Sequence, residues 1–182
     1  MCSSAFHEPP LRRFLLSGLL RNLLTLLRAF LSRERVSAKS RVITHFWATP
    51  FDCGISTLKS DKYLQFVEAA QVDYLVRTRL FHTLLRDGLR FVNVSQLVKF
   101  ARPVGMFQRV RIETAIVFAD TKCAYFSHQF FLGNHQHGEV LVKMKFKKGS
   151  MTIRPGELID HAFAAKPACI DTWDLALEAM GE

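Results

Sequence analysis

The sequence contains no Cys-x-x-Cys pair, because its four cysteines are spread over the whole chain. This spacing indicates neither a zinc ribbon nor a dense disulfide framework, and it favours a reducing compartment. Internal repeats, low-complexity segments and disorder-scale polar tracts are also absent. With 182 residues, 49% of them hydrophobic, the chain is long enough for one core, which predicts one domain with extensions.

Acidic residues are scarce, with 16 Asp and Glu against 25 Lys and Arg, which gives a formal net charge of +9. Residues 1–41 hold eight basic and two acidic side chains, and so carry six of the nine net charges. The basic excess therefore lies with a leucine-rich segment and not with aromatic residues on a predicted sheet. This distribution argues against nucleic-acid binding.

Residues 11–33 contain no acidic side chain, and their polar side chains recur at helical steps along one face. Leucines cover the rest, so the segment predicts a basic amphipathic helix that suits the surface of a membrane. Arg21 and Arg28 make a full membrane span costly. The polar strip consists of Arg13, Ser17, Arg21, Thr25, Arg28 and Ser32.

Three other interpretations of this helix stay open. A secretory signal peptide is the weakest, because arginines interrupt the apolar region and no small-x-small cleavage site follows. A mitochondrial presequence fits the Arg-rich, acid-poor composition. The helix can also pack on the domain or on a partner subunit. We expect a cytoplasmic protein held peripherally at the inner face of a membrane, with organelle targeting as the alternative.

Residues 60–88 predict a long helix with one buried side. Ser60 is a suitable N-cap, Gly88 a left-handed C-cap, and a turn near Thr78 can interrupt the helix. Apolar side chains recur every three or four residues, and polar ones fall elsewhere on the helical wheel. The buried side contains Tyr63, Phe66, Val67, Ala70 and Tyr74, and the polar positions are Lys62, Gln65, Asp73 and Arg77.

Five β-like segments accompany this helix, one before it and four after it. They lie at residues 41–49, 90–101, 109–119, 122–132 and 140–147, with a loop at 133–138 before the last. Such a succession predicts an antiparallel sheet, and the only long helix must cover its one apolar face. The expected fold class is therefore α+β.

Alternation within the 109–119 segment predicts a half-buried strand. One face should carry Val110, Ile112, Thr114, Ile116 and Phe118. Towards the end of the chain, Pro155 is expected to open a short helix, and Asp171 or Thr172 to cap a final amphipathic helix.

The order of elements and several local strings resemble the hot-dog fold acyl-CoA thioesterases of the hydroxybenzoyl-CoA thioesterase-like family. These strings are Thr-Pro-Phe-Asp at 49–52, Lys-Tyr-Leu-Gln-Phe-Val-Glu-Ala-Ala at 62–70 and Gln-Leu-Val-Lys-Phe-Ala-Arg-Pro at 96–103, together with the runs at 107–114 and 122–131. The resemblance implies an antiparallel sheet wrapped around one long central helix. We expect the amphipathic helix at residues 1–38, the hot-dog domain at 39–155 and a helical tail at 156–182.

The family motif is Asp-x-Asp, a short loop, His-x-Asn-Asn, and a Tyr that opens the helix. Asp52 matches the first Asp, and Tyr63 and Glu68 also match. Gly54, however, stands where the second Asp, the usual catalytic carboxylate of the family, is expected. Residues 57–60, Thr-Leu-Lys-Ser, replace the His and Asn residues.

Hydrolysis of a thioester needs a carboxylate and hydrogen-bond donors for the developing oxyanion. The unpaired amides at Ser60 and Asp61, at the positive end of the helix dipole, can supply the donors. Asp52 is the first candidate carboxylate, unless it only forms a turn, and Glu68 from either subunit is the second. Asp61 is a better helix-stabilising residue than a base.

The resemblance implies that two subunits pair through their sheets as a homodimer or homotetramer, with an acyl-CoA site between them. Basic side chains at its rim would hold the phosphates. Candidate substrate-binding residues are Lys59, Lys62, Tyr63, Lys99, Arg102 and Arg109.

No cofactor is expected. A metal site made by Cys123, His128, His135 and His137 is disfavoured, because they lack paired-cysteine spacing. His45 suggests the histidine-based dehydratases of the same fold, but no acidic partner follows it at a recognisable spacing.

Two functions remain. The first is an acyl-CoA thioesterase for fatty or aryl thioesters, and the alternative is a non-catalytic hot-dog protein that binds acyl thioesters or scaffolds at a membrane. An Asp52 carboxylate in a pocket beside the Ser60 amide would favour the enzyme. A filled site or an outward Asp52 would favour the binding protein.

Overall fold

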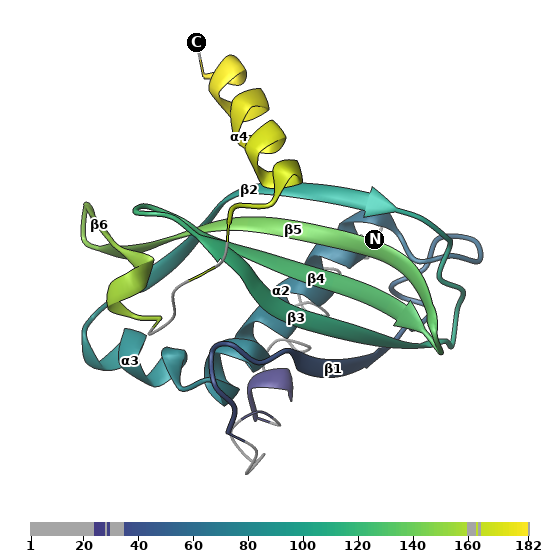
Figure 1. Ribbon diagram of the computed structural model, residues 1–182. Helices are drawn as coiled ribbons and strands as arrows, with labels where there is room; N and C mark the ends of the chain where they lie inside the picture. The colour runs from purple at the N-terminus through teal and green to yellow at the C-terminus, as the bar shows by residue number, and fades with distance from the viewer. Residues whose placement is uncertain (1–23, 28, 30–34, 160–162, 164, 182) are drawn as a thin grey trace, which may run out of the picture.

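The computed structural model describes residues 24–27, 29, 35–159, 163 and 165–181. A curled antiparallel sheet lies across one long helix, which crosses behind the strands in Figure 1. This arrangement confirms the α+β prediction. The elements are β1 (Val42–Trp47), α2 (Ser60–Arg77), α3 (Leu80–Arg86), β2 (Arg90–Phe100), β3 (Arg109–Ala119), β4 (Ala124–Leu132), β5 (His135–Lys148), β6 (Met151–Ile153), the 3₁₀ turn η1 (Pro155–Glu157) and α4 (Ala168–Met180).

The strands lie side by side in the order β1-β3-β4-β5-β2, and β6 pairs with the end of β5. All pairings are antiparallel. Strands β1 and β2 therefore form the two edges of the main sheet. The face that packs on α2 is called the inner face below, and the opposite face the outer face.

The hydrophobic core lies between α2 and the inner face. Phe66 of α2 stacks on Phe46 with ring centroids 5.2 Å apart, and Tyr74 meets Phe126 edge-on at 5.5 Å. Alternate residues of β4 and β5 complete this layer because successive side chains point to opposite faces. They are Ala124, Phe126, Phe130, Val140, Val142, Met144 and Phe146.

The long helix is interrupted near Thr78, as predicted. Arg79 adopts a left-handed conformation with φ of 64°, which separates α2 from α3, and Gly88 follows α3 with φ of 65°. The expected N-cap is wrong. Lys59 holds the N-cap position in an extended conformation, and no side chain caps the helix. Ser60 is already the first helical residue, so its hydroxyl does not serve as the cap.

Two positions predicted to lie on the polar side of α2 are buried. Asp73 is 7% exposed because its Oδ2 accepts a 2.6 Å hydrogen bond from Thr44 and lies 3.6 Å from Arg77 Nη1. Lys62 is 1% exposed, and its ammonium donates to Gln65 Oε1 at 3.0 Å. The prediction assumed that only one side of the helix is buried. In the structure other segments cover α2 on more than one side, so polar positions such as these are buried too.

The predicted alternation of β3 holds up to Ile116 and then fails. A register shift between Ile116 and Phe118 sends Phe118 to the outer face. There its ring lies 5.9 Å from that of Tyr125. A β-bulge adds one residue to one strand only, so every later side chain changes face.

The predicted loop at 133–138 is also too long. Leu132 pairs with His135, which leaves a two-residue turn at Gly133 and Asn134. Gly133 supplies the positive φ, 57°, that such a turn requires.

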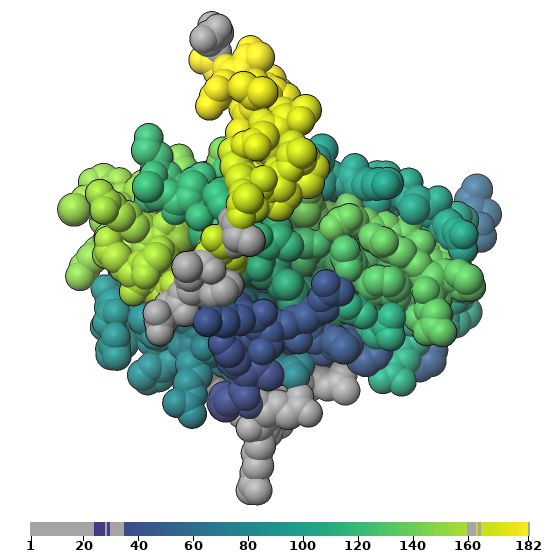
Figure 2. Space-filling model, in the orientation of Figure 1, coloured from purple at the N-terminus to yellow at the C-terminus, as the bar shows by residue number. Residues whose placement is uncertain are grey.

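The final helix, α4, begins at Ala168, three residues before the earlier of the two predicted caps. Pro167 is its N-cap residue and fixes the chain direction there. Ile170 and Trp173 are its buried residues and pack on Tyr125 and Cys123 of the outer face. The rest of α4 projects beyond the sheet (Figures 1 and 2).

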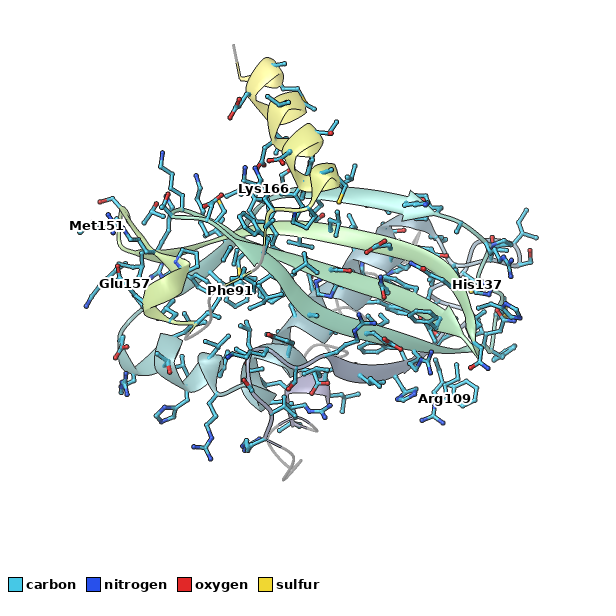
Figure 3. The ribbon with its side chains drawn as sticks, viewed as in Figure 1. Phe91, Arg109, His137, Met151, Glu157 and Lys166 are labelled. Carbon is cyan, nitrogen blue, oxygen red and sulfur yellow. The ribbon has the colours of Figure 1, made fainter. Side chains whose placement is uncertain are left out.

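Asp174 anchors α4 to the outer face. Its carboxylate accepts hydrogen bonds from Tyr125 Oη and Lys143 Nζ, both at 2.7 Å. Lys166 Nζ lies 2.8 Å from the same carboxylate and is drawn at the base of α4 in Figure 3. These partners come from β4, β5 and the preceding loop, so the base of α4 has a fixed position.

Most of the predicted amphipathic helix lies outside the described residues. Residues 24–27 and 29 are helical, with Thr25 and Ala29 buried and Leu24 and Leu27 each 50% exposed. Thr25, predicted on the solvated polar strip, is therefore buried. Within the described ranges, no helix has the length and apolarity needed to cross a membrane. The predicted domain boundaries stay predictions.

Candidate functional site

A pocket of about 310 Å³ opens at the N-terminus of α2. Its wall on one side is the start of the helix, and on the other the end of β2 with the chain that follows. Figure 3 labels His137 and Arg109 at this same end of the sheet. The pocket is lined by Thr57, Leu58, Ser60, Tyr63, Phe100, Ala101, Arg102 and Pro103.

The two sides of the pocket are hydrogen-bonded to each other beneath it. Leu58 N donates to Val104 O at 2.8 Å, and Met106 N donates to Ser56 O at 3.1 Å. Thr57 also forms an isolated β-bridge with Gly105. The loop that leads into α2 is thus fixed against the loop that leaves β2, which sets where the helix begins.

The first amides of α2 are available to a ligand. The N–H groups of Ser60 and Asp61 have no acceptor within the helix, as in any first helical turn, and no side chain caps this end. The positive end of the helix dipole lies here as well. Since Ser60 lines the pocket, an acyl oxygen bound at this place would meet unpaired donors in a positive potential.

Tyr63 forms the apolar side of the pocket. It is 4% exposed, and its ring lies 5.0 Å from those of Phe100 and Phe130. Burial raises the pKa of the Tyr63 hydroxyl, with a smaller contribution from Cys53. The phenol is therefore neutral at physiological pH and can act as a hydrogen-bond donor.

His137 holds the chain that carries Arg102. Its backbone carbonyl accepts hydrogen bonds from Ala101 N and Arg102 N, both at 3.0 Å. Its ring Nδ1–H donates to Pro103 O at 2.9 Å. The sequence contains no signal for this role, because it depends on the pairing of β5 with β2.

Asp52 does not line this pocket. It is completely buried, and its Oδ2 accepts hydrogen bonds from Thr49 N at 3.0 Å and Thr49 Oγ1 at 2.6 Å. Its backbone carbonyl also accepts a hydrogen bond from Lys59 N at 3.0 Å. Asp52 therefore closes the turn that precedes α2. This is the turn-forming role that the sequence left open as the alternative to a catalytic one.

No carboxylate lines the pocket in the part of the chain that the structure describes. Asp61 is exposed in the first turn of α2, and its side chain is 62% accessible. Glu68 is also exposed, but it lies two turns further along, roughly 12 Å from Ser60 along the helix axis. Gly54, at the place of the family's second Asp, has room for a side chain: a Cβ there would meet only Thr57 O, at 3.9 Å.

The predicted substrate-binding residues fall into two groups. Tyr63 and Arg102 line the pocket with Ser60, and the half-buried Lys59 directly precedes the helix. Lys99 instead lines a separate cavity on the outer face. Lys62 is buried in contact with Gln65, as described above, and Arg109 begins β3.

The histidines considered as metal ligands have other contacts. His128 is fully buried under the sheet, where its Nδ1 lies 3.0 Å from Thr114 Oγ1. The His137 ring donates to Pro103. Among the described residues, no three His, Cys, Asp or Glu side chains gather as a metal site would require. His45 is exposed, and its pKa is lowered by partial burial and by Arg109 and Arg111.

Comparison with solved structures identifies the fold as the hot-dog fold. A probable thioesterase from Bartonella henselae matches with a TM-score of 0.58 and 19% identity, over 63% of this chain and 98% of that one. The 4-hydroxybenzoyl CoA thioesterase from Pseudomonas sp. strain CBS-3 matches with a TM-score of 0.58 and 17% identity, over 66% and 97%. The probable thioesterase YbaW from Escherichia coli has a TM-score of 0.61 and 18% identity, over 65% and 93%.

No curated protein matches the chain. A family model does, however, and its description is the thioesterase-like superfamily. It covers residues 56–158, from the loop before α2 to the residue after η1, and so includes the pocket described above. The chain therefore belongs to the thioesterase-like superfamily.

Proposed function

We propose that this protein binds acyl thioesters of coenzyme A at the N-terminus of α2 and hydrolyses them. The observation that carries the proposal is the pocket in which Ser60, the first residue of the uncapped helix α2, lies beside Tyr63 and Arg102. The thioesterases among the similar structures, one of them a 4-hydroxybenzoyl CoA thioesterase, support this substrate class.

The thioester carbonyl oxygen would accept hydrogen bonds from the Ser60 and Asp61 amides. These bonds strengthen as the oxygen becomes an oxyanion, so they favour the transition state over the bound substrate. Tyr63 and Phe100 provide an apolar surface for the acyl group, and Arg102 lies where it can hold a phosphate of coenzyme A.

We assign the base to Glu68 of a second copy of the chain. Within one copy Glu68 is too far from Ser60 to act on the same carbonyl, because roughly 12 Å separates them along the helix. Edge strand β2 exposes Val92, Val94, Leu97 and Phe100, and an exposed apolar edge is suited to pairing with a second copy. A homodimer, or a tetramer built from two such dimers, would bring another α2 near the pocket.

In the proposed reaction, Glu68 takes a proton from a water molecule as the water oxygen attacks the thioester carbon. The tetrahedral intermediate then collapses, and the carbon–sulfur bond breaks. The departing thiolate takes up the proton, so the products are a carboxylic acid and free coenzyme A. No step requires a cofactor.

A second candidate function is binding of acyl thioesters without hydrolysis. Two observations favour it: no carboxylate lines the pocket among the described residues, and Gly54 replaces the family's catalytic Asp. The same pocket would then hold the acyl thioester, and the thioester would stay unhydrolysed because no base is present.

Release of free coenzyme A from a panel of acyl-CoAs separates the two functions. The wild type is expected to turn over at least one fatty or aryl thioester, and Glu68→Gln should lower kcat by about 10²-fold with little change in KM. Full activity in Glu68→Gln would refute its role as base. Saturable binding by the wild type without any turnover would select the binding protein.

We also propose a peripheral contact with a membrane through the N-terminal helix. Leu24 and Leu27 are each 50% exposed, whereas Thr25 and Ala29 are buried, so leucines face outward in the described part of this helix. Flotation with anionic phospholipid vesicles tests it: the full chain should float, and a Leu24→Glu/Leu27→Glu variant should not. Equal flotation of both would contradict the proposal.

A further inference from the structure

A second cavity, of about 400 Å³, lies on the outer face of the sheet. Its floor comes from β2, β3, β4 and β5, and the first residues of α4 cover one side. Cavities of about 300–1,000 Å³ are typical of small-molecule sites. Figure 1 shows α2 and the base of α4 on opposite sides of the sheet. The cavity shares no lining residue with the pocket at the start of α2, so the two are separate.

Cross-strand pairing divides the floor into two rows. Glu113, Gln129, Glu139 and Lys99 are successive neighbours across four strands and form a polar row. Two residues further along each strand, Ala115, Ser127, Leu141 and Leu97 form a second row, which is apolar except for Ser127. Pro167 and Ile170 lie beside this second row at the base of α4. The cavity thus has one polar end and one apolar end.

Most hydrogen-bonding groups of the polar row already have partners. Arg41 Nη1 donates to Glu113 Oε2 at 2.6 Å and to Gln129 Oε1 at 3.3 Å. Ser127 Oγ and Gln129 Nε2 donate to Glu139 Oε1, at 2.7 and 3.4 Å. Glu113 Oε1 lies 3.3 Å from Arg111 Nη2. In the described part of the chain, the ammonium of Lys99 and the second carboxylate oxygen, Oε2, of Glu139 have no hydrogen bond.

The charges of the side chains that line the polar end balance, and Arg111, which pairs with Glu113, lies outside the lining. Arg41 and Lys99 are positive, and Glu113 and Glu139 are negative. An anionic head group would meet the free oxygen of Glu139, and a cationic head group would meet Lys99. A neutral group that both donates and accepts can satisfy the two free groups together.

From this arrangement we infer a binding site for a neutral amphiphile whose polar end is a carboxamide or a similar donor–acceptor group. Its oxygen accepts a hydrogen bond from Lys99, and its N–H donates to Glu139 Oε2. Its apolar chain lies over Ala115 and Leu141, against Ile170 of α4. This site does not depend on the proposed hydrolysis.

Calorimetric titration of the full chain with three medium-chain probes tests the inference. The probes share one alkyl chain and differ in charge: octanamide, octanoate and octylammonium. Octanamide is expected to bind at least about tenfold more tightly than either charged probe. Tighter binding of octanoate or octylammonium, or no binding of octanamide, would overturn the inference.

Two substitutions change the charge balance in opposite directions. Glu139→Gln removes the negative charge and should shift the preference towards octanoate, whereas Lys99→Met should shift it towards octylammonium. Glu178→Gln, an exposed residue of α4 outside the cavity, is the matched control and should keep the wild-type order. An unchanged order in both cavity variants would place the bound probe elsewhere and refute the site.

A further variant tests the apolar end. Ala115→Leu introduces a larger side chain into the second row and should weaken the binding of octanamide by about tenfold or more. Circular dichroism of the same samples shows whether the variant is folded, and light scattering shows whether its oligomeric state is that of the wild type. Undiminished octanamide binding by folded Ala115→Leu of unchanged oligomeric state would overturn the inference.

Discussion

Gly138 faces Tyr63 where β5 passes the start of α2. A Cβ on Gly138 would lie 3.6 Å from Tyr63 Cε1 and only 3.0 Å from the carbonyl oxygen of Lys99. The second distance is shorter than a normal contact to backbone, so the strand pair would have to separate before any larger residue fits. The absence of a side chain at Gly138 therefore lets β5 lie close to the backbone of β2 beside the Tyr63 ring.

We expect Gly138→Ala to destabilise the protein by about 1–3 kcal/mol, because overpacking forces the backbone to shift. Chemical denaturation measures the change. Gly156→Ala is the control, since a Cβ there meets nothing within 4 Å and its φ is not positive. Equal stability of the two variants would show that β5 and β2 can separate without cost.

Gly54→Asp should raise thioesterase activity. The position has room for a side chain, with Thr57 O at 3.9 Å as the only close atom, and the variant restores the carboxylate that the family motif has there. If the wild type hydrolyses acyl-CoA slowly, we expect an increase of about tenfold or more. Gly54→Asn has nearly the same size without the charge and should give no increase. An increase in activity in both variants would mean that the size of the side chain, and not a carboxylate base, is responsible.

Asp52→Asn should lower the stability of the fold and should not directly abolish turnover of acyl-CoA. The Asp52 carboxylate is buried and accepts two hydrogen bonds from Thr49, so loss of its charge weakens the turn before α2. We expect a loss of about 1–3 kcal/mol in the free energy of unfolding. Thr49→Val removes one donor of the same turn and should also destabilise it. Full stability of Asp52→Asn with loss of turnover would instead indicate a chemical role.

His128 makes stability depend on pH. Complete burial lowers its pKa from 6.5 to about 3, so the folded protein keeps the ring neutral while the unfolded chain binds a proton below pH 6.5. The unfolded state therefore binds more protons, and stability falls as pH decreases from 6.5 towards 3, by on the order of 1 kcal/mol per pH unit.

Denaturation of the wild type and of Thr114→Val/His128→Phe at pH 7 and pH 5 measures this dependence. The double variant removes the Thr114–His128 hydrogen bond together with the titrating ring, so that neither partner is left unpaired. Its loss of stability between the two pH values should be smaller. An identical pH dependence in both proteins would show that His128 is not the group responsible.

Patterns of alternating side chains predicted the five strands of the main sheet, but not β6 or the first residues of β5. Val110, Ile112 and Ile116 lie in the core because the sheet has one face against α2, and that makes burial alternate along each strand. Phe118 breaks the pattern because a bulge is a property of paired strands, which one strand's sequence does not reveal. The burial of Asp73 was missed for a similar reason, because its partner Thr44 belongs to β1, which is far from α2 in the sequence but next to it in space.

The candidate site could be predicted only in part. Ser60 follows from the predicted helix start, and the family motif indicates Tyr63. The roles of the other residues depend on three-dimensional contacts. Asp52 closes a turn with Thr49, Lys99 lies opposite Glu139 in the cross-strand row, and the His137 ring donates a hydrogen bond to Pro103 O. Residue types alone do not distinguish a carboxylate that closes a turn from one that faces a pocket.

The hydrogen bonds that join the loop before α2 to the chain after β2 have a consequence for motion. Because Leu58 N donates to Val104 O and Met106 N to Ser56 O, we expect both walls of the pocket to open together as one local unfolding unit. Amide hydrogen exchange at Leu58 and Met106 should therefore show similar protection factors. Ligand that protects one amide from exchange should protect the other, although the two residues lie on opposite sides of the α2–β2 segment of the sequence.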